Sequence, residues 1–200
     1  MHPDRSFDPQ DRDACVALVE DVGFAMIFAA MPDGPRVAHA PVVWSGDGAL
    51  RFHLSARNAL VPHLDGATVL CVVNGPDAYV SARWYSDPAQ VPTWNYVSVE
   101  MEGAVRRLDD DGLRAQLEAV TTAHEARIVE GEAWTIDKMP EDKLRAMMKG
   151  IVGFELAVTA WRPTFKLSQN KRAEERERVM QGLEAAGGAA MVATMRKLAA

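Results

Sequence analysis

The sequence predicts a mainly β fold, an antiparallel barrel with flanking helices. Six or seven strand-like runs follow one another in hairpin order, and most of the helical patterns come late in the chain. There is no GxGxxG motif and no strict alternation of strands with helices, so a parallel dinucleotide-binding sheet is not expected. The 200 residues fit one domain of ordinary size with a helical appendage.

The first elements predicted are a helix and two hairpins. Asp8 followed by Pro9 is typical of a helix start, and Gly23 ends the apolar helical pattern that follows. Three strands separated by Gly-rich turns are then expected at 24–30, 36–44 and 50–55.

The middle of the chain alternates between short strands and breaks. A strand that ends at Gly75-Pro76 is expected, and residues 94–108 alternate over a long strand. Within it, Gly103 indicates a bulge or a close backbone approach. Further elements are predicted as a short helix at 58–64, strands at 69–74, 78–84 and 152–165, and helices at 113–128, at 140–148 and from 171 onward with a break at Gly187-Gly188.

Charge and hydropathy restrict the class of protein. The formal net charge is −6 and the pI is about 5.4, which argues against broad nucleic-acid binding. No apolar run approaches 18 residues, and the charged start of the chain lacks the apolar region of a signal peptide. We therefore expect a cytoplasmic protein without a membrane segment.

The residue types used for metal binding and covalent catalysis show no suitable spacing. Among five histidines, His39 and His53 are the two that a hairpin could bring together, without a third ligand, so no metal site is expected. There is no GxSxG motif. Cys15 and Cys71 lie in apolar patterns and are interpreted as buried small hydrophobic residues.

A segment at the end of the third strand has the residue types of a phosphate site. His53, Ser55, Arg57 and Asn58 lie where a strand ends and a helix is expected to begin. Unpaired backbone N–H groups, a hydroxyl, an amide and a guanidinium would all suit an anion there. The alternative is a helix cap beside a surface arginine.

Two further segments combine polar and aromatic residues. Thr93, Trp94, Asn95 and Tyr96 offer two rings and two polar groups, which suit a planar heteroaromatic ligand or, alternatively, fill the end of a barrel. In the other segment, Lys166, Ser168, Gln169 and Asn170 end a strand and lead into a charged helix, which Ser168 or Asn170 would cap in the simpler interpretation.

Four motifs carry a family resemblance: GPDAYVSARWY at 75–85, VPTWNYV at 91–97, KGIVGFEL at 149–156 and FKLSQNKR at 165–172. In order and spacing they resemble the PaiB-type FMN-binding negative transcriptional regulators, over about residues 1–185. The resemblance implies an FMN-binding split β-barrel similar to the pyridoxamine-phosphate oxidase-like flavoproteins. It also implies a homodimer with flavin between the subunits.

The resemblance also assigns the predicted site. The segment from His53 to Asn58 would face the FMN phosphate, and the strand with His39 and Val42 would lie under the isoalloxazine. The segments Thr93–Tyr96 and Ser168–Asn170 would close the site, one of them from the other subunit, with Lys166 beside them. The domain expected to bind FMN spans residues 1–168, and residues 169–200 form a C-terminal helical segment that packs on or near the barrel.

Three functions remain open on the sequence. The first is a dimeric FMN-binding protein of the regulator type, with no direct DNA binding expected because basic and acidic residues alternate after Asn170. The second is an enzyme, an FMN-dependent oxidoreductase or oxygenase that acts on an unknown small molecule. The third is a structural dimer with a vestigial flavin cleft.

Overall fold

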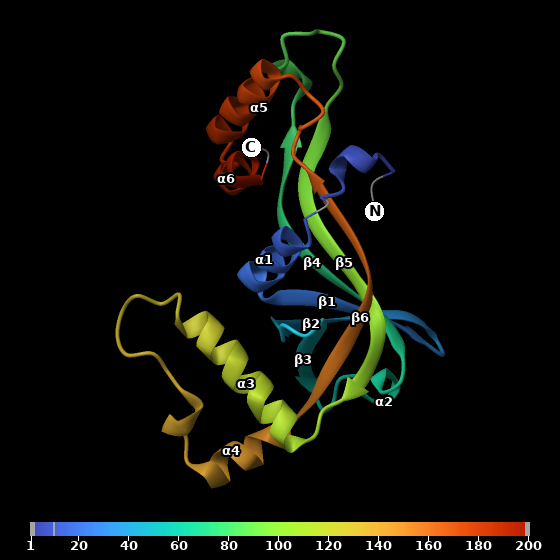
Figure 1. Cartoon of the computed structure of the whole chain (residues 1–200), viewed down its shortest axis with the longest axis vertical. Helices are drawn as coiled ribbons and strands as arrows, with labels where there is room; N and C mark the ends of the chain where they lie inside the picture. Colours follow the sequence, from blue (N-terminus) through green and yellow to red (C-terminus); the bar gives the residue numbers. More distant parts are fainter. Residues whose placement is uncertain (1–2, 10, 199–200) are drawn as a thin grey trace. The chain divides into compact units, whose positions relative to one another are not determined.

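The computed structural model describes residues 3–9 and 11–198. Its strands form a closed barrel in the order β1-β2-β3-β6-β5-β4 (Figure 1). The strands are β1 (Phe24–Met31), β2 (Gly34–Trp44), β3 (Ala49–Ser55), β4 (Thr68–Val80), β5 (Thr93–Arg107) and β6 (Ile151–Lys166). The helices are α1 (Arg12–Val22), α2 (Val61–Leu64), α3 (Asp110–Glu125), α4 (Glu141–Met148), α5 (Ala173–Ala185) and α6 (Ala189–Leu198), with short 3₁₀ turns η1 (Arg5–Phe7), η2 (Ala82–Trp84) and η3 (Ile136–Lys138).

The chain divides into two compact units. The barrel unit comprises residues 16–73 and 100–161, and the terminal unit comprises residues 1–15, 74–99 and 162–200. The barrel unit holds β1, β2 and β3 entirely, whereas β4, β5 and β6 contribute residues to both units. The predicted boundary at residue 168 differs from this division and stays a prediction.

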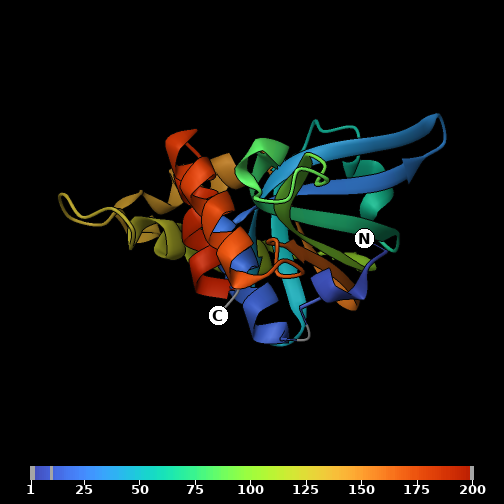
Figure 2. The same cartoon turned by 90° about the horizontal axis from the view of Figure 1, so that it is seen from above.

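The barrel unit is built from the predicted hairpins. β1 and β2 pair from Phe24–Pro41 to Met31–Gly34, and their hairpin is prominent in Figure 2. β3 pairs with β6 over its whole length. Alternate residues point inward, so the rings of Phe52 and Phe154 stack at 5.5 Å between centroids in the core.

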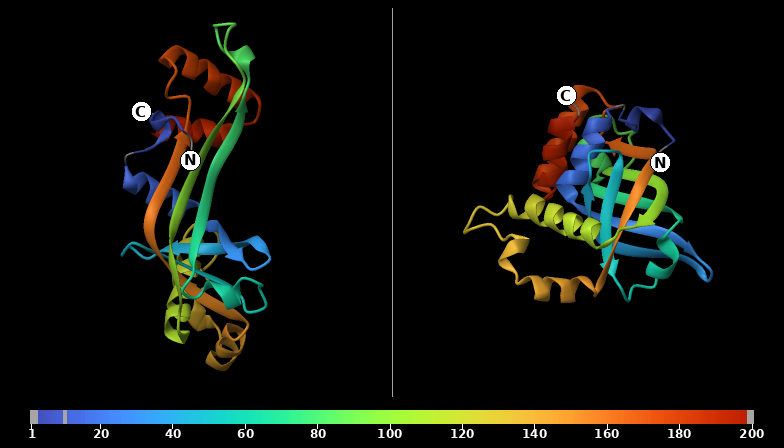
Figure 3. Two further views of the ribbon diagram at one scale, coloured as in Figure 1. Left: turned by 90° about the vertical axis from the view of Figure 1, so that its right-hand side faces the viewer. Right: turned by 60° about the horizontal axis from the view of Figure 1, so that its bottom comes forward.

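Helix α3 lies against β2 and β3 in the barrel unit (Figure 3). Its start is capped by Asp109, whose Oδ1 accepts the Gly112 N–H at 2.8 Å. After the helix ends, Arg127 donates to the main-chain carbonyls of Glu20 and Asp21 in the last turn of α1. A basic side chain at this position satisfies carbonyls that the helix leaves unpaired.

Strands β5 and β6 come unusually close at Gly103. A Cβ atom on this glycine would lie 1.8 Å from the main-chain oxygen of Ala157. Only glycine fits such a contact, so the expected close backbone approach at Gly103 is confirmed.

The terminal unit has its own apolar core between two helices. α5 and α6 lie side by side in Figures 1 and 2 and bury Leu183, Met191 and Met195 almost completely. The indole of Trp84 lies on Gly182, where a Cβ atom would be 2.3 Å from the ring. These contacts join the η2 turn to α5.

The mainly β barrel with flanking helices is confirmed, and five local predictions are wrong. The strand expected at 78–84 ends at Val80, and Ala82–Trp84 form the η2 turn instead. Gly75-Pro76 does not interrupt the strand, because β4 runs without a break through it. α1 begins at Arg12, where Asp11 Oδ1 accepts the Asp13 N–H, rather than at Pro9.

The other two corrections concern helices. α2 is shorter than predicted, because the side chain of Asn58 accepts the Leu60 N–H in a turn that precedes it. α3 ends at Glu125, so Ile128 lies outside the predicted helical stripe and is 61% exposed.

None of the helices between residues 3 and 198 has the length and apolar character needed to cross a membrane. In the same part of the chain, no three His, Cys, Asp or Glu side chains are grouped so that they could hold a metal ion.

Candidate functional site

The fourteen predicted site residues fall into two groups, one in each unit. The barrel unit holds His39, Val42, His53, Ser55, Arg57 and Asn58. The terminal unit holds Thr93, Trp94, Asn95, Tyr96, Lys166, Ser168, Gln169 and Asn170.

His53 is held in one orientation by a buried amide. β3 directs Phe52 and Leu54 into the core and leaves His53 on the opposite face, half-buried. His53 Nδ1 lies 2.9 Å from Oε1 of Gln116 on α3, so Nδ1 donates and Nε2 is the acceptor. Burial lowers the pKa of His53, against the opposing effect of the Gln116 hydrogen bond. The imidazole is therefore neutral near pH 7.

The turn after β3 satisfies its own backbone. The N–H groups of Ala56, Arg57 and Asn58 donate to Gly150 O, Ser55 Oγ and Ser55 O respectively. The expected unpaired N–H groups are therefore absent at these three positions. α2 has only four residues, so its N-terminus does not provide an anion site either. Any phosphate at this turn has to be held by side chains.

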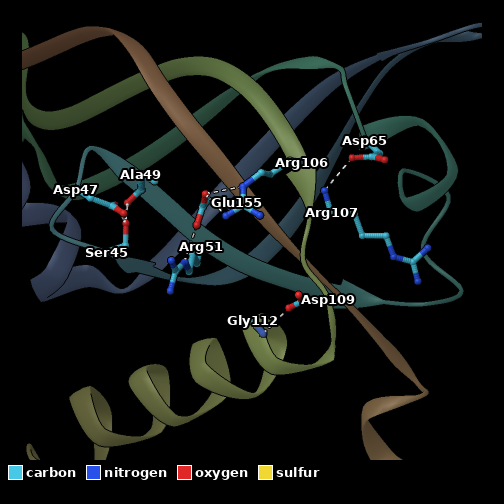
Figure 4. Close-up of polar contacts among 10 residues, drawn as sticks. All are labelled: Ser45, Asp47, Ala49, Arg51, Asp65, Arg106, Arg107, Asp109, Gly112 and Glu155. Carbon is cyan, nitrogen blue, oxygen red and sulfur yellow. Dashed lines mark hydrogen bonds and ion pairs between the residues drawn. The ribbon is translucent and has the colours of Figure 1, made fainter.

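Those side chains are basic. A cavity of about 610 Å³ in the barrel unit is lined by Ala56 of this turn and by Arg107, Arg145 and Lys149. Asp110, Asp111 and Glu141 line it as well, and Glu141 forms ion pairs with Arg114 and Arg145. Within the described residues the guanidinium of Arg57 and the ammonium of Lys149 have no ion-pair partner. Arg107 binds Asp65 only through its main-chain N–H (Figure 4).

The β2 residues differ from each other in orientation. Val42 is 2% exposed and points into the barrel core. His39 is exposed on the other face, where its ring stacks on Phe24 at 6.3 Å between centroids. The register pairs His39 with Met26, and no contact brings it to His53.

In the terminal unit, Asn95 and Ser168 form a buried polar pair. Asn95 Nδ2 lies 2.9 Å from Ser168 Oγ, and the two oxygens Ser168 Oγ and Asn95 Oδ1 are 3.1 Å apart. Asn95 Nδ2 also lies 3.6 Å from the sulfur of Met195. Ser168 adopts a left-handed backbone with φ of +60°. These contacts satisfy both side chains internally and fix the connection between β6 and α5.

The other predicted residues of the terminal unit differ in exposure. Trp94 is 53% exposed and packs edge-to-face on Tyr79 with ring centroids 6.0 Å apart. The side-chain amide of Gln169 is hydrogen-bonded to the main chain just before it, because it accepts the Leu167 N–H and donates to Phe165 O. Asn170 is exposed and, with Lys166 and Thr93, lines a second cavity of about 230 Å³.

Sequence reasoning missed four residues that take part in these arrangements: Tyr85, Gln90, Gln116 and Lys171. Lys171 stands in the FKLSQNKR motif, and in the sequence it is one of the basic residues that alternate with acidic residues after Asn170. Gln116 is fully buried, and its Nε2 lacks a hydrogen-bond partner within the described residues. A glutamine has no charge or motif that marks it in a sequence, so only its position within the helical stripe of α3 was available as a signal.

Comparison with known proteins decides the family. The sequence matches the family described as "Putative FMN-binding domain" over residues 1–160. The chain belongs to this family. A Bacillus subtilis relative, "Protease synthase and sporulation protein PAI 2", is 36% identical over 116 residues. That match covers 58% of this chain and 55%, about half, of the Bacillus protein. An uncharacterized protein of Emericella nidulans is 29% identical over 76% of this chain and 74% of that one.

Solved structures agree on the fold. The FAD and heme binding protein from Mycobacterium smegmatis has a TM-score of 0.61 at 21% identity, covering 84% of this chain and 78% of that one. The flavocytochrome Anf3 from Azotobacter vinelandii has a TM-score of 0.60 at 14% identity, covering 88% and 78%. The PaiB-like, split-barrel nature of the chain is thus confirmed, and its family supports FMN as the cofactor.

Proposed function

We propose that this FMN-binding split-barrel protein holds the flavin phosphate at the turn after β3. The single observation that carries this proposal is the basic side-chain set at that turn. Arg57 is exposed without an ion pair in the described chain, and Lys149 lies next to Gly150, which accepts the Ala56 N–H at 2.9 Å. A guanidinium and an ammonium of this kind suit phosphate oxygens.

The residues of the barrel unit would have separate tasks. Arg57 and Lys149 bind the phosphate by charge, and Ser55 contributes a hydroxyl. His53, neutral and oriented by Gln116, offers Nε2 as a hydrogen-bond acceptor. FMN itself, when bound, supplies the redox chemistry. The assignments of His39, Val42, Thr93–Tyr96, Lys166 and Ser168–Asn170 to flavin stay predictions.

Binding of FMN and riboflavin tests the phosphate assignment. Riboflavin lacks the phosphate, so it should bind more weakly than FMN by the value of a charged hydrogen bond, about 1.5–3 kcal/mol. Arg57→Ala should remove most of that difference, and Arg36→Ala, at an exposed position near the start of β2, is the matched control. Flavin fluorescence quenching measures both affinities. Equal affinity of the native chain for the two flavins would overturn the assignment.

We propose further that the protein acts as a homodimer. Tyr79, Val91 and Trp94 are between 50% and 71% exposed in the terminal unit, and a second copy would cover such apolar side chains. Light scattering should give twice the chain mass of 21.9 kDa. A monomer that still binds FMN tightly would contradict the proposal.

Any regulatory role is proposed to be indirect. Helix α5 carries Glu174 and Glu175 in its first turn beside Arg172, and the net charge of the chain is −6. Non-specific DNA binders reach a Kd of about 10⁻⁴–10⁻⁶ M through phosphate contacts. We expect no shift of promoter DNA below that range at physiological salt. A nanomolar, sequence-dependent shift that Arg172→Ala with Arg176→Ala abolishes would contradict this expectation.

A further inference from the structure

The second cavity, in the terminal unit, has an unusual balance of charge. It has a volume of about 230 Å³ and contains two lysines in its wall. The cavity is lined by Asp4, Phe7, Tyr85, Gln90, Val91, Thr93, Asn95, Lys166, Ser168, Asn170 and Lys171. These residues come from three separate parts of the sequence, so the cavity is a product of the fold.

Lys166 is held by a neutral partner. Its Nζ donates to Thr93 Oγ1 at 2.7 Å and lies 5.7 Å from the centre of the Phe7 ring. An ammonium has three N–H donors, so the bond to Thr93 leaves two of them available. Burial, and secondarily the positive charge of Lys171, lowers the pKa of Lys166.

Lys171 is placed in the same way. Its Nζ donates to Gln90 Oε1 at 2.6 Å and lies 5.3 Å from the centre of the Tyr85 ring. In the described part of the chain neither lysine forms an ion pair with a carboxylate. Among the described residues, the two ammonium groups contact only neutral oxygens and aromatic rings. Their mutual repulsion is unfavourable, and an anion bound between them would offset it.

The remaining wall supplies further polar groups. The Tyr85 hydroxyl is hydrogen-bonded to Ser168, and the exposed Asn170 lies at the wall with its amide. One carboxylate, that of Asp4, also lines the cavity, and its Oδ1 accepts the Ser6 N–H at 2.9 Å. A second carboxylate, that of Asp87, interacts electrostatically with Lys171 without forming an ion pair and accepts the Gln90 amide at 2.8 Å. Both ammonium groups therefore keep N–H donors that no carboxylate of the described chain binds directly.

We infer that this cavity binds a small dianion, a phosphate or dicarboxylate group, between Lys166 and Lys171. Its volume is below the roughly 300–1,000 Å³ of pockets for drug-sized ligands, so the ligand is a small molecule or the anionic end of a larger one. The inference does not rest on the proposed flavin phosphate site in the barrel unit. It reassigns Lys166 and Asn170 from flavin to a second ligand.

Titration of the FMN-loaded protein with inorganic phosphate and with succinate tests the inference by calorimetry. A matched series of sodium chloride measures simple screening of the lysines. We expect saturable binding of one dianion per chain by at least one of the two probes. Phosphate alone, or succinate alone, would identify which oxyanion geometry the cavity prefers.

Three variants locate the binding. Lys171→Met should weaken dianion binding about 10- to 100-fold, as expected for loss of a charged hydrogen bond, and leave FMN affinity unchanged. Lys166→Met should weaken dianion binding by a similar factor. Asn170→Asp should weaken it comparably by placing a negative charge at the exposed wall, with little risk to folding. Lys197→Met, on an exposed position of α6, is the control and should have no effect.

The outcomes separate this site from the flavin site. The inference is overturned by an absence of saturable binding at millimolar dianion, or by full binding in the two cavity lysine variants. It is also overturned if those variants lose FMN and dianion affinity together, because the cavity would then hold the flavin phosphate. Loss of FMN binding in Arg57→Ala with dianion binding intact would support both sites.

Discussion

Two clusters of paired cations, one in each unit, differ in whether the protein supplies the anion. In the barrel unit Glu155 lies between two arginines, with Arg51 Nε 2.7 Å from Oε2 and Arg106 Nη2 2.6 Å from Oε1 (Figure 4). In the terminal unit Lys166 and Lys171 line one cavity, and both donate to neutral oxygens. The arginines of the first cluster are paired with a carboxylate of the protein, whereas the lysines of the second are paired with none that the structure describes.

The residue types fit this difference. A guanidinium is planar and pairs with a carboxylate edge, and Arg51 and Glu155 are direct partners in the β3–β6 register. Glu155 is 9% exposed, so its charge has to be neutralised by the protein itself. Lysines are compact, strongly hydrated charges at the ends of flexible chains and accept a ligand more readily than a fixed partner. A cluster of cationic side chains thus indicates an anion-binding site when the protein supplies no carboxylate to pair with it.

Gly103→Ala should have the largest effect, because it separates β5 and β6, the strands that carry Arg106 and Glu155. Gly103 lies three residues before Arg106, and the neighbour its Cβ would meet is Ala157, two residues after Glu155. The new Cβ would be 1.8 Å from a main-chain oxygen, which cannot move as a side chain can. We expect a loss of more than about 4 kcal/mol in the free energy of unfolding, or no folded protein.

Urea unfolding followed by circular dichroism measures this loss. Ala104→Ser, at the exposed neighbouring position, is the control and should change stability by less than about 0.5 kcal/mol. A Gly103→Ala protein as stable as the control would show that β5 and β6 are not in close contact there.

Glu155→Gln should have the next largest effect. It leaves two arginines beside a neutral amide, and removing one partner of a buried ion pair costs about 3–5 kcal/mol. Because Arg106 is 63% exposed, water compensates in part, and we expect about 2–4 kcal/mol. Glu118→Gln, which removes an exposed helical ion pair with Arg114, should cost at most about 0.5 kcal/mol. Equal losses in the two variants would refute the structural role of the arginine cluster.

Lys166→Met should change stability by no more than about 1 kcal/mol. It removes one hydrogen bond to Thr93, worth about 0.5–1.5 kcal/mol, and also removes a half-buried charge beside a like charge. The difference from Glu155→Gln should appear in the same urea experiment. Whichever of phosphate and succinate binds should raise the Tm of the native chain more than that of Lys166→Met. A loss as large as that of Glu155→Gln would mean that the lysine is structural.

His53 should give the smallest effect, and it depends on pH. Burial lowers its pKa from the ordinary value of 6.5, so the folded state binds this proton less readily than the unfolded state. The contribution of the neutral imidazole is present above pH 6.5 and is lost as the pH falls through the lowered value. Native protein should therefore lose more stability than His53→Gln between about pH 7.5 and pH 5. Ala104→Ser, at an exposed position without a titratable group, should follow the native curve.

The strand pattern could be predicted because burial repeats with a period of two. Val97, Val99 and Met101 alternate with less buried residues along β5, as expected from the sequence. The continuity of β4 could not be predicted, because proline lacks a backbone N–H and normally ends a strand. The pairing of β4 with β1 reaches only as far as Val72, so Pro76 lies beyond it and its missing N–H costs no hydrogen bond to β1.

The candidate sites were predictable only in part. The segment from His53 to Asn58 was found from its residue types, but its backbone N–H groups proved to be paired within the turn and with Gly150. Nothing about the charged neighbours of Lys171 in the sequence indicates that it lines a cavity. Its side chain is positioned by Tyr85 and Gln90, which are more than eighty residues earlier in the chain. Contacts over such distances leave no local pattern.

Because both cysteines are buried, the surface of this protein carries no reactive thiol. Burial raises the pKa of Cys15 to about 11 and that of Cys71 to about 12, so neither forms a thiolate near neutral pH. A cysteine introduced by Ala104→Cys in the barrel unit or Ala190→Cys in the terminal unit would be the first reactive thiol there. Spin labels on the pair could then follow the separation of the two units as flavin and dianion are added, with no native residue to be removed first.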